Sequence, residues 1–83
     1  MAIKISDKDA NELLAFFTEE IIRLEEENMV WHMEMVDEPG DHDWYQRKID
    51  SNNDRIFRLE KLASKIGKID KKRIITEVQN WMY

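Results

Sequence analysis

Apolar residues recur at alternating steps of three and four along residues 14–35, and again along residues 45–66. The first stripe contains Leu14, Phe17, Ile21, Leu24, Asn28, Trp31 and Met35. The second stripe contains Tyr45, Ile49, Asn52, Ile56, Leu59, Ala63 and Ile66. This spacing is the heptad pattern in which one narrow face of a helix packs on another helix. The two stripes predict two helices, over residues 7–35 and 43–66.

The two stripes become complementary when the chain folds back within residues 36–42, where a proline is followed by a glycine. Proline ends the preceding helix and glycine permits a tight turn. In the resulting register Leu14 faces Ile66 at one end and Met35 faces Tyr45 at the other. An a position meets a d position in every pair, as antiparallel helices require. The pattern therefore predicts an all-α fold built on a long, coiled-coil-like antiparallel hairpin.

Two asparagines interrupt the stripes, and the register places Asn28 directly opposite Asn52. A buried asparagine pair lowers stability but fixes the register and the number of helices. We therefore assign Asn28 and Asn52 a structural role in the register. The alternative is that both amides point into a cavity and contact a ligand. Beside the stripes, the same register pairs Glu27 with Arg55 and Glu34 with Lys48, and the members of each pair have opposite charges.

A shorter apolar stripe follows Gly67 and predicts a third helix over residues 70–82. Its members, which share one side of a helix, are Ile74, Ile75, Val78, Trp81 and Met82. Ser6 and Asp70 are residue types favoured as helix N-caps. Gly67 is expected at the C′ position after the second helix, where glycine adopts the left-handed conformation. The whole chain, residues 1–83, is then one helical domain.

The third helix is expected to dock at the open end of the hairpin, over an apolar edge formed by Leu13, Leu62 and Ile69. It spans only about 18 Å at 1.5 Å per residue, so it cannot reach the turn end. The turn end is rich in large apolar side chains that a single seam cannot bury. These residues are Met29, Trp31, Met33, Met35, Trp44 and Tyr45.

Exposed apolar patches of this size mark interfaces, in which methionine adapts to its partner and tryptophan acts as an anchor. The patch near the turn therefore predicts one of two arrangements. Two or more hairpins bury it in a homo-oligomeric helical bundle, or another protein binds it.

Charge is distributed unevenly along the chain, whose net charge is −5. Residues 6–38 carry eleven acids and two bases, so this helix repels phosphates and direct nucleic-acid binding is not expected. The same charge suits an acidic mimic of nucleic acid that inhibits a nucleic-acid-binding protein.

The start of the third helix is basic and is a candidate site for an anionic small molecule such as a nucleotide. The residues of this candidate anion site are Lys68, Lys71, Lys72, Arg73 and the aromatic Trp81. The alternative is a solvated basic turn that complements the acidic helix.

Several classes of chemistry are not expected. The chain has no cysteine, which fits a reducing, cytoplasmic setting without disulfides. Charges interrupt the apolar residues every few positions, so a membrane span is not expected. The serines, histidines and acids match no catalytic or metal-binding spacing. We therefore expect no enzyme activity, no metal site and no cofactor.

The sequence predicts a non-enzymatic protein-interaction module of the adaptor or inhibitor type, such as the small accessory factors of phages and bacteria. Its binding surface is the Met/Trp-rich patch near the turn, and its partners are itself and another protein. The first alternative is an oligomeric protein that sequesters an anionic small molecule. The second alternative is the acidic nucleic-acid mimic.

Overall fold

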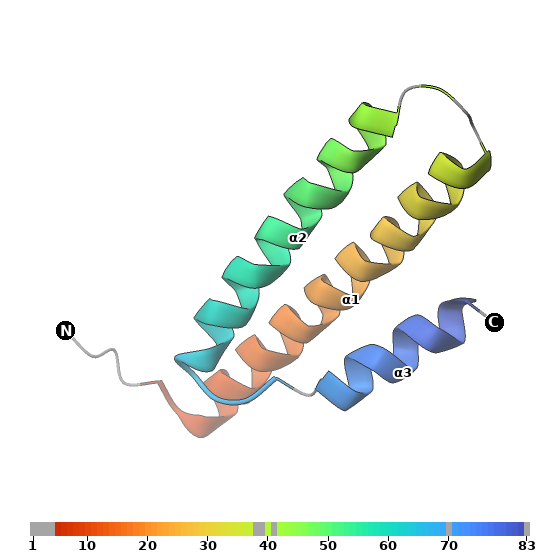
Figure 1. The fold of residues 1–83 in the computed structure, drawn as a ribbon. Helices are drawn as coiled ribbons and strands as arrows, with labels where there is room; N and C mark the ends of the chain where they lie inside the picture. Colours follow the sequence, from red (N-terminus) through yellow and green to blue (C-terminus); the bar gives the residue numbers. More distant parts are fainter. Residues whose placement is uncertain (1–4, 38–39, 41, 70, 83) are drawn as a thin grey trace.

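Three helices make up the computed structural model, which describes residues 5–37, 40, 42–69 and 71–82, with side chains as far as Asn80. They are α1 (Asp7–Asp37), α2 (His42–Ser64) and α3 (Lys71–Met82). Figure 1 shows α1 and α2 as a long antiparallel hairpin, with α3 returning along α1 from the open end. The predicted all-α fold is confirmed. The structure is of one chain, so the predicted homo-oligomer stays a prediction.

The helix ends follow local capping. The hydroxyl of Ser6 accepts a hydrogen bond from the backbone N–H of Asp9 at 3.2 Å, so Ser6 is the N-cap that the sequence predicts. Helix α1 extends two residues beyond its predicted end, and α2 ends two residues before its predicted end. The predicted cap at Asp70 lies outside the described residues.

The core lies along the seam between α1 and α2. Its buried cluster consists of Ile21, Leu24, Ile56 and Leu59. Ala63 is completely buried, and the register places this small residue opposite the large Phe17. Every apolar residue buried on α2 belongs to the predicted stripe, so the heptad pattern accounts for how α2 packs.

Neither of the two predicted ion pairs beside the seam, Glu27–Arg55 and Glu34–Lys48, is among the salt bridges of the described residues. Arg55 Nε lies 3.6 Å from Glu20 Oε1, whereas the register paired Arg55 with Glu27. Glu27 has other partners, because its Oε1 accepts hydrogen bonds from Asn52 Nδ2 at 3.0 Å and from Trp31 Nε1 at 3.4 Å.

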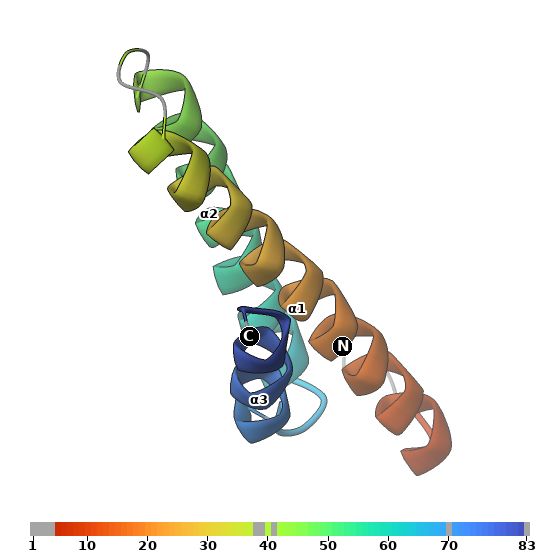
Figure 2. The same cartoon turned by 90° about the vertical axis from the view of Figure 1, so that its right-hand side faces the viewer.

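The third helix docks on a different side of the hairpin from the one predicted. Leu13 and Leu62 remain 38% and 48% exposed. Instead α3 packs on α1, and two residues of α1 that lie outside the seam stripe, Thr18 and Ile22, are buried. Ile74 of α3 packs against the core cluster. Figure 2 shows α3 beside the first half of α1, so the turn end lies beyond its reach.

Gly67 does not adopt the left-handed conformation expected at a C′ position, because its φ is not positive. The chain leaves α2 through a tight turn, in which the N–H groups of Ile66 and Gly67 both donate to the carbonyl of Ala63 at 2.9 Å. A Cβ atom at position 67 would lie 2.9 Å from Leu14 Cδ1. Glycine is therefore suited to this position by its close approach to α1.

Candidate interaction surfaces

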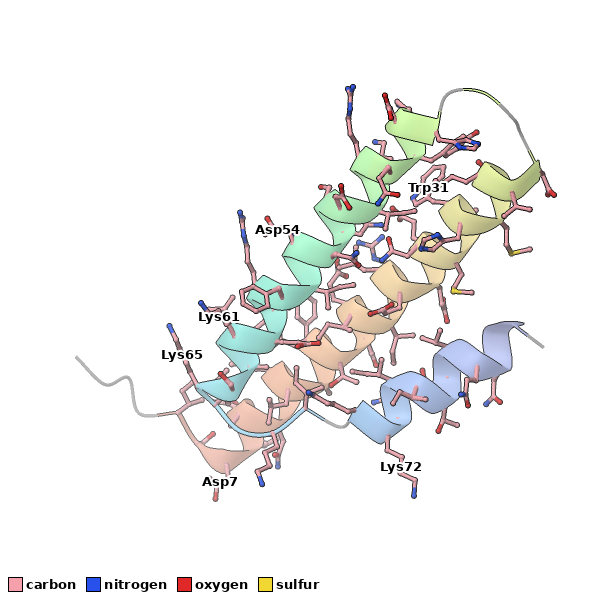
Figure 3. All side chains as sticks on the ribbon, viewed as in Figure 1. Asp7, Trp31, Asp54, Lys61, Lys65 and Lys72 are labelled. Carbon is pink, nitrogen blue, oxygen red and sulfur yellow. The ribbon has the colours of Figure 1, made fainter. Side chains whose placement is uncertain are left out.

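The turn end of the hairpin is organised around three aromatic rings. Trp31 and Trp44 meet edge to face with centroids 5.3 Å apart, and Tyr45 lies 5.9 Å from Trp31 and 5.0 Å from Trp44. Figure 3 shows Trp31 near the turn, in the space between α1 and α2. These three residues, called the aromatic cluster below, pack mainly on one another, and α3 does not reach them.

One member of the aromatic cluster, Trp44, and two side chains near the end of α1 are strongly exposed. Met33 is 58% exposed, Val36 84% and Trp44 46%, whereas Met29 and Met35 are half-buried. The predicted patch therefore divides into partly buried residues near the seam and exposed residues around them. We call Met33, Val36 and Trp44 the turn-end surface.

The asparagine pair forms a hydrogen-bonded network inside the hairpin. Asn52 Nδ2 donates to Asn28 Oδ1 and to Glu27 Oε1, both at 3.0 Å. Asn28 Nδ2 in turn donates to Asn53 Oδ1 at 2.9 Å. Among the described residues, no buried side-chain nitrogen or oxygen lacks a partner. Asn52 Nδ2 thus donates two hydrogen bonds within the hairpin. This arrangement fits the predicted role of the asparagine pair in fixing the helix register.

Carboxylates beside the seam have shifted pKa values. The hydrogen bond from Asn52 is the main cause that lowers the pKa of Glu27. The hydrogen bond from Arg23 lowers the pKa of Glu20 in the same way. Glu25 differs, because burial and then the neighbouring charge of Glu60 raise its pKa. One edge of α1 therefore favours charged carboxylates, while the site of Glu25 disfavours them.

A groove of about 560 Å³ opens near the other end of the hairpin, between α2 and the connection that leads into α3. Phe57 and Ile69 give it apolar walls, the side chains of Lys61, Lys68 and Lys71 surround them, and Glu60 is the acid among its lining residues. Lys61 Nζ lies 5.1 Å from the centre of the Phe57 ring. We call these six residues the lysine groove.

The lysine groove contains only part of the predicted anion site. Lys68 and Lys71 line it, but Arg73 donates a hydrogen bond to Glu77 at 2.8 Å and lies 3.9 Å from Glu19. The side chain of Trp81 lies outside the described residues. Sequence reasoning missed Phe57 and Lys61, because both face away from the hairpin seam. The signal in the sequence was Phe57 itself, a large apolar residue that lies outside the heptad stripe of α2.

The described side chains contain no group of three or more histidines and acids placed to hold a metal ion. None of the described helices is both long enough and apolar enough to cross a membrane. Comparisons of the chain with protein-family models, curated proteins and solved structures found no match.

Proposed function

We propose that this protein is a non-enzymatic interaction module of the adaptor or inhibitor type, which binds another protein through the turn-end surface. The observation that carries the proposal is the exposure of Met33, Val36 and Trp44, at 58%, 84% and 46%, around a single turn. Removing such apolar surface from water contributes about 25 cal/mol for each Å² buried. A partner that covers these side chains gains this free energy on binding.

The aromatic cluster favours binding because it holds Trp44, one residue of the turn-end surface, in place. Trp44 contacts the rings of Trp31 and Tyr45, and Lys48 Nζ lies 5.4 Å from the centre of its ring. A side chain fixed in advance loses less conformational entropy when a partner arrives. Met33 adds a flexible side chain that adapts to the shape of the partner.

The charge around the turn-end surface indicates the chemistry of the partner. Glu34 and Asp37 are exposed neighbours of Met33 and Val36 on α1, and Asp43 is exposed beside Trp44 on α2. Opposite charges steer association and exclude wrong partners. The complementary partner has an apolar groove with basic residues at its edge.

The double variant Met33→Gln/Val36→Gln tests the proposal. A photo-crosslinker at position 33 in the wild-type chain, used in cells that make the protein, traps the partner, which is then purified and titrated by calorimetry. We expect the double variant to weaken this binding by about 30-fold or more, the effect of losing a dominant contact.

Leu62→Gln is the matched control, because Leu62 is 48% exposed but lies at the open end. This control should bind like the wild-type protein. Equal affinity of the partner for the wild-type chain and the double variant would show that the turn-end surface is not the binding site.

A further inference from the structure

The lysine groove combines exposed apolar surface with lysines that have no acidic partner in the described part of the chain. Phe57 is 58% exposed. Within the described part of the chain, Lys61, Lys68 and Lys71 form no salt bridge with any acid. Three lysines against the single acid Glu60 leave the described lining with a net positive charge. An apolar wall with a net positive charge around it complements an apolar side chain that is flanked by acids.

Such a side chain is present on α1. Phe16 is 61% exposed, and its ring lies 6.0 Å from that of Phe17, which packs against the core. Glu12 precedes Phe16 by four residues and Asp9 precedes it by seven, so all three lie along one side of α1. Asp9 and Glu12 are exposed, and neither forms a salt bridge within the described part of the chain. We call Asp9, Glu12 and Phe16 the acidic ridge.

We propose that the lysine groove binds the acidic ridge of a second copy of this chain. Phe16 of one copy packs against Phe57 of the other, and the carboxylates of Asp9 and Glu12 meet the groove lysines. The contact must form between copies, because Phe16 does not line the groove of its own chain. This contact is separate from the turn-end surface and does not depend on the proposed function.

The contact joins two different patches, one on α1 and one on α2 with its connection to α3. Such heterologous contacts build chains of subunits unless the rotation between copies closes them into a ring. The charges involved are exposed, so salt screens their attraction. Self-association should therefore increase with protein concentration and weaken as salt is added.

Light scattering after size-exclusion chromatography tests the proposal over a range of protein concentrations. The molar mass of the wild-type protein should rise above the 10.1 kDa of one chain. Phe16→Glu and the double variant Lys68→Glu/Lys71→Glu should each lower the association constant by about 30-fold or more. Arg47→Glu/Lys72→Glu changes the net charge equally outside the groove, and Met33→Glu changes an equally exposed apolar residue. Both controls should associate like the wild-type protein.

Mixing the two defective variants gives the sharpest result. The Phe16→Glu chain keeps an intact groove, and the Lys68→Glu/Lys71→Glu chain keeps an intact ridge. Their mixture should form dimers of twice the protomer mass, although each variant alone is monomeric. Circular dichroism of each variant verifies that it is folded. If Phe16→Glu unfolds the chain, Lys68→Glu/Lys71→Glu alone still tests the contact.

Three results would overturn the proposal. The first is a wild-type protein that stays at 10.1 kDa at every concentration. The second is association that survives both groove and ridge substitutions. The third is a monomer that ATP protects from thermal unfolding only when Lys68 and Lys71 are intact, which would make the groove a site for a small anion.

Discussion

At the scale of single residues, Asn52 links the register of the hairpin to the ionisation of its neighbour. Its amide donates to Asn28 and to Glu27, both at 3.0 Å. The first bond aligns α1 with α2, and the second stabilises the charged form of Glu27 and lowers its pKa. A shift of the helices by one residue would leave these polar groups buried without partners, which is costly.

Replacing Asn28 by leucine should lower the free energy of unfolding by about 1–3 kcal/mol, because Asn52 then loses its partner in the seam. The double variant Asn28→Leu/Asn52→Leu should recover stability, since an apolar pair replaces both amides, but it should lose the fixed register. Urea unfolding gives the stabilities, and disulfide trapping across the seam reports the register. A single variant as stable as the wild-type protein would contradict the role of this network.

The raised pKa of Glu25 determines how the free energy of unfolding changes with pH. Burial and then Glu60 raise its folded-state pKa. The folded protein therefore holds this proton more tightly than the unfolded chain, and stability is lost as pH rises through the folded pKa. Glu25→Gln should raise the Tm at pH 7 and lose this advantage below about pH 4, near the unfolded pKa.

The adjacent Glu26→Gln removes the same charge and is the control for Glu25→Gln. Thermal unfolding followed by circular dichroism at both pH values measures the difference. Equal changes in Tm for the two variants would show that net charge, and not the site of Glu25, causes the effect.

At the scale of elements, the sequence predicts the hairpin because the residues of each stripe are close in sequence and recur with the same heptad spacing. The docking side of α3 was not predictable in this way. Thr18 and Ile22 are the residues of α1 that are buried outside the seam stripe, but Ile22 lies one position from the seam residue Ile21, and Thr18 is polar by type. The hydroxyl of Thr18 donates a hydrogen bond to the Leu14 carbonyl at 2.7 Å, so this polar side chain can be buried.

The lysine groove was also missed, for a related reason. It forms where the connection after α2 brings Lys68 and Ile69 back towards Phe57. The proximity of these residues depends on tertiary packing, and the periodic pattern within a single helix does not predict it. The predicted anion site grouped lysines that are close in sequence, whereas the structure directs Arg73 to Glu77 and Glu19.

Ile22→Ala should loosen α3 more than the hairpin, because Ile22 is buried outside the α1–α2 seam. We expect a loss of about 2–4 kcal/mol in the free energy of unfolding, within the range for buried isoleucine. Hydrogen exchange should become faster mainly in α3. Ile75→Ala is the control, because Ile75 is 56% exposed on α3. Equal losses for the two variants would contradict the docking of α3 on this side of α1.

At the scale of the whole molecule, the chain is elongated and thin, with extents of 51 × 30 × 13 Å. The turn-end surface and the lysine groove lie towards opposite ends of the hairpin. Self-association through the proposed contact at the open end would therefore leave the turn-end surface accessible in each copy. The account predicts an assembly that displays several partner-binding surfaces, which raises the effective concentration for a multivalent partner.

The most direct test of the central claim compares the molar mass of the wild-type protein with that of Met33→Gln/Val36→Gln by light scattering at matched concentrations. The account predicts the same mass for both at every concentration, because the turn-end surface is reserved for another protein. A wild-type multimer that becomes a 10.1-kDa monomer in the variant would contradict it. That result would show that copies of this chain bury Met33 and Val36 against one another.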